Sequence, residues 1–324
     1  LLLEKDIKLD VSDEFGSRAL ILVASSGNIE ISELLLKKGI NVTKVGGALI
    51  AAAQNGHKEV CKLLIDSKAK VDAVSKSGWT ALMIAAVKGY KEVCELLIKK
   101  GAEVNKANKD GGTALIIGAQ EGHREVCKLL IEREAEIEAA NKDGLTALML
   151  AVYEGHREVC ELLIEKGAKI EAEMKDGTRS LMIAAVRGHK EVCKLLMERG
   201  AEIEAENKGK VRALMLAAEK GRKEVCKLLI EKRAEIEAEM EGGTKALMLA
   251  AEKGHKEVCE LLIEKGAEIE VSAKDGTRAL MLASQEGHKE LCELLIELGA
   301  EVEASNKDGK RALMLGAVKG HKEV

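Results

Sequence analysis

A strict 33-residue period limits what this chain can fold into. Its eight cysteines stand one period apart, from Cys61 to Cys292, and its seven histidines share a second column of the same period. Tyr90 and Arg222 fill the two gaps in the histidine column. A repeat of this length encodes one small supersecondary motif many times over. Such a motif cannot bury its apolar face alone, so neighbouring repeats must stack to form the core.

The repeat reads K-D-G-x-[TR]-A-L-M-x-A-A-x-x-G-H-x-E-V-C-x-L-L-I-E-K-G-A-x-I-E-A. We predict one array over residues 1–324, with a partial repeat at 1–15 that begins inside a helix and a truncated repeat at 309–324. A repeat at 16–44 is four residues short between Gly39 and Ala48. Full repeats are predicted at 45–77, 78–110, 111–143, 144–176, 177–209, 210–242, 243–275 and 276–308. Because both ends fall inside a repeat, we expect a fragment of a longer array.

Each repeat predicts two helices and a turn. TALMIAAVKG (80–89) predicts a short first helix with Gly89 as its left-handed cap, and KEVCELLIKK (91–100) predicts a second helix capped by Gly101. ANKDG (107–111) then supplies turn residues. Ala, Leu, Glu and Lys dominate a chain that has no proline and 1% aromatic residues, which favours an all-α protein. The buried side of the second helix is predicted to hold Val93, Cys94, Leu96, Leu97 and Ile98.

These motifs resemble the ankyrin repeat, which shares the period, the D-G-x-T-x-L start, A-A-x-x-G-H after the first helix and G-A-x-[IV] after the second. The resemblance covers essentially the whole chain and implies an all-α solenoid of stacked helix–turn–helix repeats with short turn fingers. The family's T-P-L-H becomes Thr80-Ala81-Leu82-Met83, so its threonine–histidine hydrogen bond is unavailable, and we expect methionine to fill the space. The threonine becomes Arg or Lys at 179, 212, 245, 278 and 311.

A histidine four residues before a cysteine, as in His255 and Cys259, suggests a metal site or an activated nucleophile. Zinc requires four ligands within about 2.3 Å, whereas equivalent residues of stacked repeats lie roughly 10 Å apart. That spacing is also too long for a disulfide, whose Cα atoms lie within about 7 Å of each other. The resemblance implies a buried cysteine and a histidine that bonds to backbone in the turn. We therefore predict no metal, no cofactor and no disulfide.

Neither the glycines nor the charges indicate another activity. Every histidine belongs to the repeat column, and Gly209-Lys210 and Gly309-Lys310 lack the earlier glycine of a phosphate-binding loop. We therefore expect no catalytic residue and no enzyme. The chain has 51 basic and 55 acidic residues, and no apolar run approaches the roughly 18 residues of a membrane helix. We expect neither nucleic acid nor a membrane as partner. Eight unpaired thiols favour a reducing compartment, which is the cytoplasm or alternatively the nucleus.

The resemblance implies a function in protein binding, through the concave face and the turn tips of the array. Partners of ankyrin repeats contact the turn tips and the first helix. At those positions this chain concentrates large apolar side chains between 78 and 188, with polar neighbours, as an interface hot spot requires. The predicted partner-binding residues are Trp79, Val87, Lys88, Gln120, Leu145, Tyr153, Val186 and Arg187. The competing interpretation is drift at tolerant positions.

Three functions stay open on the sequence. The first is a non-catalytic scaffold that binds a protein partner of unknown identity and is itself a monomer. The second is a regulatory or targeting arm of a longer enzyme or channel, whose catalytic part lies outside this fragment. The third is an engineered or recently duplicated array that has no dedicated partner.

The repeat at 210–242 is predicted to be the least stable. Lys210 replaces the turn glycine, Arg222 the loop histidine and Arg233 the glycine that caps the second helix. A non-glycine residue in a left-handed conformation costs on the order of 1 kcal/mol, and in a stacked array such losses stay local. Two further repeats replace the same capping glycine, with Lys68 and Glu134.

Overall fold

The computed structural model describes residues 14–324, and the helix predicted at the very start of the chain lies outside them. Within 14–324 the secondary structure consists of nineteen α-helices, one 3₁₀ turn and three isolated β-bridges. The all-α prediction is therefore confirmed. The chain forms two compact halves, an N-terminal half that ends at Ala168 and a C-terminal half from Lys169 to Val324. The division into one continuous array with the stated repeat boundaries stays a prediction.

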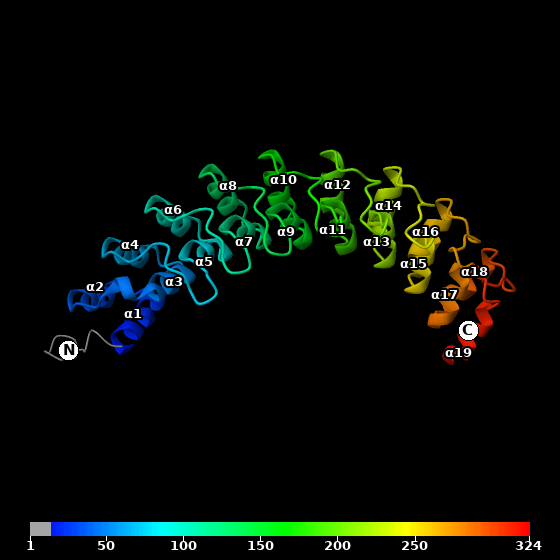
Figure 1. The fold of residues 1–324 in the computed structure, drawn as a ribbon, viewed down its shortest axis with the longest axis horizontal. Helices are drawn as coiled ribbons and strands as arrows, with labels where there is room; N and C mark the ends of the chain where they lie inside the picture. Colours follow the sequence, from blue (N-terminus) through cyan, green and yellow to red (C-terminus); the bar gives the residue numbers. More distant parts are fainter. Residues whose placement is uncertain (1–13) are drawn as a thin grey trace. The chain divides into compact units, whose positions relative to one another are not determined.

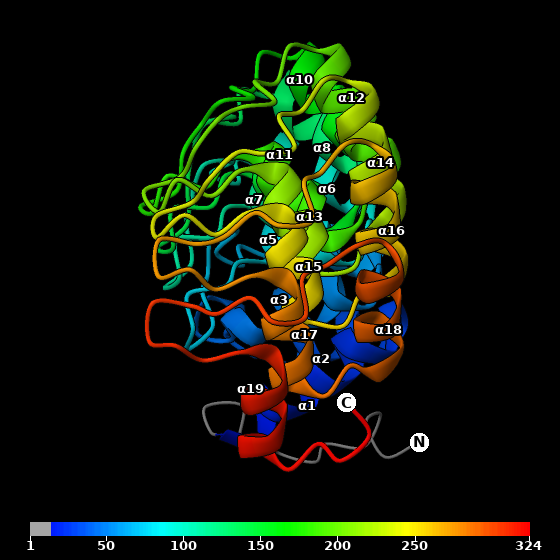
Figure 2. The ribbon, with the colours of Figure 1, turned by 90° about the vertical axis from the view of Figure 1, so that its right-hand side faces the viewer.

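In the N-terminal half, the first helices of successive repeats pack side by side in one row, and the second helices pack in another (Figures 1 and 2). Each first helix also packs against the second helix that follows it. The first helices are α1 (Glu14–Ser26), α3 (Gly46–Gln54), α5 (Ala81–Val87), α7 (Ala114–Gln120) and α9 (Ala147–Glu154). The second helices are α2 (Ile29–Lys37), α4 (Lys58–Asp66), α6 (Lys91–Lys99), α8 (Arg124–Glu132) and α10 (Arg157–Glu165).

The C-terminal half repeats this arrangement, with one row of first helices and one row of second helices. Its first helices are α11 (Ser180–Arg187), α13 (Ala213–Glu219), α15 (Ala246–Glu252), α17 (Ala279–Glu286) and α19 (Ala312–Lys319). Its second helices are α12 (Lys190–Glu198), α14 (Lys223–Glu231), α16 (Lys256–Glu264) and α18 (Lys289–Glu297).

The repeat at 78–110 shows how the sequence determines each helix pair. Thr80 precedes α5, and its hydroxyl accepts a hydrogen bond from the Met83 N–H at 3.2 Å. Gly89 and Gly101 follow α5 and α6 with φ of 72° and 93°, the left-handed conformation that glycine adopts most readily. Both predicted helices are confirmed. The predicted buried side of α6 is correct for Val93, Cys94 and Leu97, whereas Leu96 and Ile98 are only half-buried.

Small and flexible side chains fill the space between the two rows. In α5, Ala85 and Ala86 are fully buried, which allows the first helices of adjacent repeats to approach closely. Met83 is 1% exposed and its sulfur lies 3.5 Å from the Thr80 nitrogen. The methionine thus occupies the interior at the position where the family motif has histidine. A core of this kind needs no aromatic side chain.

Between successive helix pairs the chain forms a finger, a tight hairpin that projects beside the first helices (Figure 2). In the finger of the repeat at 78–110, the Asn108 N–H donates to the Gly112 carbonyl at 3.0 Å. Adjacent fingers are also linked, because the Lys142 N–H donates to the Asp110 carbonyl at 2.9 Å. The shortened repeat replaces its finger with the 3₁₀ turn Val42–Lys44.

Four residues other than glycine have a positive φ among residues 14–324. Lys68, Glu134 and Arg233 follow second helices with φ of 74°, 64° and 69°, and Lys210 lies at a finger tip with φ of 58°. The sequence predicted a left-handed backbone at all four, from their alignment with glycine in other repeats. That part of the stability argument is confirmed, and the ranking of the repeats stays a prediction.

Candidate functional site

The histidine column connects successive repeats. His123 Nε2 lies 2.9 Å from the Val87 carbonyl oxygen, and His156 Nε2 lies 2.9 Å from the carbonyl oxygen of Gln120. In each case the acceptor is near the end of the first helix of the preceding repeat. His57, His255, His288 and His321 make the same contact at 3.0–3.1 Å. The resemblance implied a backbone contact in the turn; the structure shows that this contact is between repeats.

Arg222 preserves this contact where the column lacks a histidine. Its Nε donates to the Val186 carbonyl oxygen at 3.0 Å, and its Cδ lies 2.8 Å from where a Cβ on Gly188 would be. In other repeats the imidazole ring lies against the equivalent glycine in the same way, as His255 does against Gly221. The sequence analysis gave Arg222 as one of three replacements that weaken the repeat at 210–242. The structure shows that this replacement keeps the bond between repeats, and its effect on stability stays a prediction.

The cysteine column is buried in the second helices, and all eight thiols are free. Seven of the cysteines are 0% exposed and Cys292 is 5% exposed. Burial raises the pKa of those seven thiols to about 12 and that of Cys292 to about 11. A thiol with such a pKa is a poor nucleophile at neutral pH. Residues 14–324 contain no group of three or more His, Cys, Asp or Glu side chains that could hold a metal ion.

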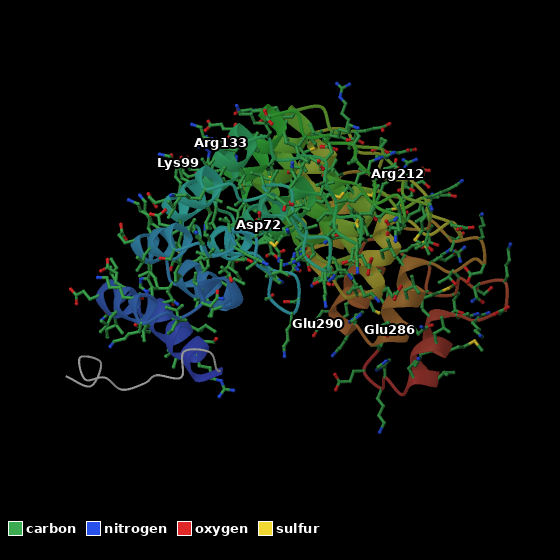
Figure 3. The ribbon with its side chains drawn as sticks, turned by 60° about the vertical axis from the view of Figure 1, so that its left-hand side comes forward. Asp72, Lys99, Arg133, Arg212, Glu286 and Glu290 are labelled. Atoms are coloured by element: carbon green, nitrogen blue, oxygen red, sulfur yellow. The ribbon has the colours of Figure 1, made fainter. Side chains whose placement is uncertain are left out.

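A column of ion pairs in the C-terminal half was missed by the sequence analysis. The threonines at 80, 113 and 146 cap their first helices through Oγ1. The Arg or Lys residues that replace them make no such cap and instead reach glutamates of the fingers. Arg212, labelled in Figure 3, contacts Glu204 and Glu235 at 2.5 Å and Glu206 at 2.8 Å. Desolvation opposes its charge, but these carboxylates outweigh that effect and raise the pKa of Arg212.

The same glutamates also connect successive fingers. Glu204 accepts the Glu235 N–H at 3.1 Å through its other carboxylate oxygen. In the N-terminal half Asp72, also labelled in Figure 3, accepts the Glu103 N–H at 3.2 Å, and burial raises the pKa of this carboxyl group. The sequence does carry a signal for the ion pairs. Wherever the capping threonine becomes Arg or Lys, the residue eight positions earlier is glutamate.

Three of the predicted partner-binding residues line one hollow of about 390 Å³ in the N-terminal half. Trp79 comes from a finger, Val87 from the end of α5, and Lys88 directly follows it. Trp79 and Val87 are half-buried and Lys88 is exposed. The hollow is completed by five residues that the sequence analysis did not single out: Ile50, Gln54, Ser75, Ser77 and Ile84. Ile84 could have been found, because it lies one helical turn before Lys88 on the same face of α5.

The remaining predicted residues are distributed over both halves. In the N-terminal half, Gln120 is exposed, Leu145 is half-buried in a finger, and Tyr153 is 42% exposed on α9. Val186 is half-buried and Arg187 exposed at the end of α11, in the C-terminal half. These five residues do not line the hollow at Trp79. That all eight bind a partner stays a prediction.

A second hollow, of about 360 Å³, occupies the corresponding surface of the C-terminal half, between the fingers and the first helices. It differs in charge, because three carboxylates and one lysine line it. Its lining residues are Thr244, Met248, Glu252, Ala273, Asp275, Thr277, Leu282, Gln285, Asn306, Asp308, Lys310 and Leu315.

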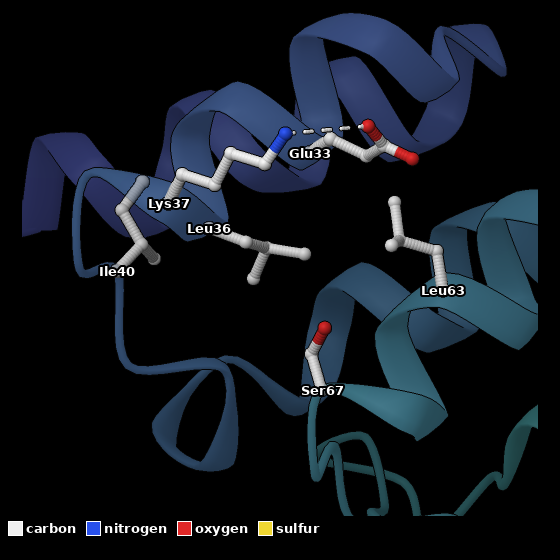
Figure 4. A pocket seen from close by; sticks show the side chains of 6 residues that line it. All are labelled: Glu33, Leu36, Lys37, Ile40, Leu63 and Ser67. Atoms are coloured by element: carbon white, nitrogen blue, oxygen red, sulfur yellow. Dashed lines mark ion pairs between the residues drawn. The ribbon is translucent and has the colours of Figure 1, made fainter.

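Other hollows lie between second helices. The hollow between α2 and α4 has a volume of about 500 Å³, and its rim carries an ion pair of 3.8 Å between Lys37 and Glu33 (Figure 4). Its apolar lining consists of Leu36, Ile40 and Leu63. A further hollow of about 380 Å³ lies between α4 and α6 and is lined mostly by lysine and glutamate. Of the four hollows described, only the one on the first-helix surface of the N-terminal half is lined by a tryptophan.

Comparison with known proteins identifies the repeats. A family model for ankyrin repeats, built on three copies, matches residues 46–108, 105–174, 134–207, 181–275 and 247–324. These matches overlap and together cover 46–324. A search of the curated proteins finds none that matches this chain. Among residues 14–324, no helix has the length and apolar character needed to cross a membrane.

Proposed function

Because the chain belongs to the ankyrin repeat family, we propose that it is a non-catalytic scaffold that binds a protein partner. Ankyrin repeats are generally modules for interaction between proteins. The partner contacts the face formed by the first helices and the fingers, and the hollow at Trp79 is its central anchor site. Eight free, buried thiols support a reducing compartment such as the cytoplasm.

The observation that carries this proposal is the position of the only tryptophan in the chain. Among the residues whose burial the structure describes, no aromatic side chain is fully buried, and yet Trp79 lies half-buried beside Ile50, Ile84 and Val87 in an open hollow. The same column holds Gly112, Leu145, Thr178, Val211, Thr244, Thr277 and Lys310 in the other repeats, so stacking does not require a particular side chain there. A partly exposed aromatic ring with apolar neighbours is typical of an interface anchor.

The test combines two substitutions that the chain already tolerates elsewhere. Trp79→Thr installs the residue found at 178, 244 and 277, and Tyr153→Gln installs the residue found at 120 and 285. A lost aromatic anchor costs about 2 kcal/mol of binding, so affinity for proteins captured by the wild type should fall well over tenfold. We expect the melting temperature to change by only a few degrees, because Trp79 is half-buried and Tyr153 is exposed.

The matched control lies on the first-helix surface of the C-terminal half. Glu252→Ala with Lys253→Ala removes an exposed ion pair of 2.7 Å and should leave capture nearly unchanged. If the aromatic double variant retains full affinity, the binding surface lies elsewhere. If that variant unfolds instead, the two rings belong to the core and the proposal fails.

A further inference from the structure

We propose, building on the function above, that the hollow at Trp79 takes an apolar side chain of the partner whose neighbouring residue is Asp or Glu. The apolar side chain enters between the finger and α5, and the carboxylate pairs with Lys88. The partner segment is therefore defined by chemistry, as an apolar anchor beside an acidic residue.

The shape and lining of the hollow define the anchor. Ile50 comes from α3, Ile84 and Val87 come from α5, and Trp79 closes the side formed by the finger. The two serines of the lining are engaged with their own finger: the Ser75 hydroxyl accepts the Trp79 N–H at 3.1 Å and lies 3.1 Å from the Ser77 hydroxyl. A volume of about 390 Å³ is within the range of sites that bury a ligand group. These contacts favour a large apolar side chain such as Leu, Ile or Phe.

The charge beside the anchor comes from Lys88. No carboxylate lines this hollow, and among residues 14–324 no ion pair involves Lys88. The lysines at the same position in two other repeats each have a carboxylate directly before them. Lys220 pairs with Glu219 at 2.9 Å, and Lys253 pairs with Glu252 at 2.7 Å.

The repeat at 78–110 has Val87 in place of that glutamate. This difference has two effects: valine adds an apolar wall to the hollow, and Lys88 lacks the carboxylate that Lys220 and Lys253 have beside them. An acidic residue of the partner would supply the missing charge. Complementary charge of this kind contributes mainly to the choice of partner.

The hollow of the C-terminal half provides an internal contrast. Its lining includes Glu252, Asp275 and Asp308 against the single cation Lys310. The same fold position therefore has the opposite charge there. An acidic partner segment is expected to avoid that hollow, which makes the preference a property of the side chains at Trp79 and not of the fold.

The test is a selection of random displayed peptides on the whole immobilised chain. We expect the enriched peptides to carry Leu, Ile or Phe next to Asp or Glu. A synthetic copy of an enriched peptide should shift the emission of Trp79, which is the only tryptophan and hence reports this hollow alone. Trp79→Thr should abolish binding of that peptide.

Lys88→Glu separates the inference from the proposed function. It installs the residue found at 121, 154 and 286, so folding should be unaffected, and the melting curve checks this. Affinity for the acidic peptide should fall by about tenfold or more, and a repeated selection should enrich Lys or Arg beside the anchor. Peptides that need Trp79 but show no acidic preference, or that ignore Lys88→Glu, overturn the inference and leave the function standing. Peptides that bind Trp79→Thr as well as the wild type, or no enrichment at all, overturn both.

Discussion

Replacing Arg233 with glycine should stabilise the C-terminal half, because this arginine has a left-handed backbone. Arg233 follows α14 with φ of 69°. In the repeats that have glycine at this position, φ lies between 93° and 103°. An ideal Cβ built on those glycines meets no atom within 4 Å. The site therefore has room for a side chain, and only the backbone conformation disfavours one.

The expected gain follows from two opposing terms. A side chain in the left-handed region costs roughly 1–2 kcal/mol, and glycine recovers that cost. Glycine also loses more conformational freedom on folding, which costs roughly 0.5–1 kcal/mol. Arg233 is exposed, so its removal forfeits little packing. The net expectation is a stabilisation of about 0.5–1 kcal/mol.

Urea unfolding of the whole chain measures the change, and hydrogen exchange locates it within residues 210–242. The matched control is Gly200→Arg, the reverse substitution at the same position of the adjacent repeat, where φ is 94°. It should destabilise by a similar amount. If Arg233→Gly gives no stabilisation, or if Gly200→Arg costs nothing, backbone strain is not what weakens these repeats. Exchange that is no faster at 210–242 than at 243–275 in the wild type would refute the predicted ranking.

Three further predictions concern ionisation, ion pairs and exposed apolar surface. Burial raises the pKa of thiols such as Cys127 and Cys226 to about 12, whereas thiols of the unfolded chain ionise near pH 8.5. Their contribution to the free energy of unfolding is therefore fully present below pH 8.5 and is lost as pH rises towards 12, by about 1.4 kcal/mol per thiol and per pH unit. Melting curves at alkaline pH measure this loss. Arg212→Thr leaves three glutamates without their cation, so it should lower the unfolding free energy by about 1 kcal/mol at low salt and by less at high salt, in urea titrations at two ionic strengths. Leu313 and Val318 on α19 are 70% and 83% exposed, so Leu313→Lys with Val318→Lys should leave the melting temperature of this chain nearly unchanged, as thermal melting curves check.

The sequence predicted well those structural features that depend only on one residue and its close neighbours along the chain. A left-handed backbone at Lys68 or Arg233 follows from aligning it with glycines, because that conformation is a property of the position itself. Helix ends at Thr80 and Gly101 follow for the same reason. Contacts between successive helix pairs and fingers were not predicted, since they depend on how one repeat is placed against the next. The ion pair between Arg212 and Glu235 and the lining of the hollow by Ile50 are of this second kind.

The contact between repeats shows how folding can be separated from the proposed choice of partner. His123 bonds to the carbonyl oxygen of Val87 and not to its side chain, which is left to line the hollow. Any residue supplies that carbonyl. The Val87 column accordingly contains valine, glutamine, tyrosine and glutamate. The backbone contact holds the repeats together while the side chain at the same residue is free to vary.

This arrangement predicts that His123→Ala and His123→Arg differ in stability. Alanine removes the donor and leaves the Val87 carbonyl without it, at a cost of about 1–2 kcal/mol. Arginine should restore most of that loss, because Arg222 makes the equivalent bond to Val186 at 3.0 Å with its side chain over the equivalent glycine. Urea unfolding of both variants decides the point, with Val87→Glu as a control that keeps the carbonyl and should leave stability nearly unchanged. If the arginine variant is as unstable as the alanine variant, the column acts through the shape of the imidazole ring and not through the bond between repeats.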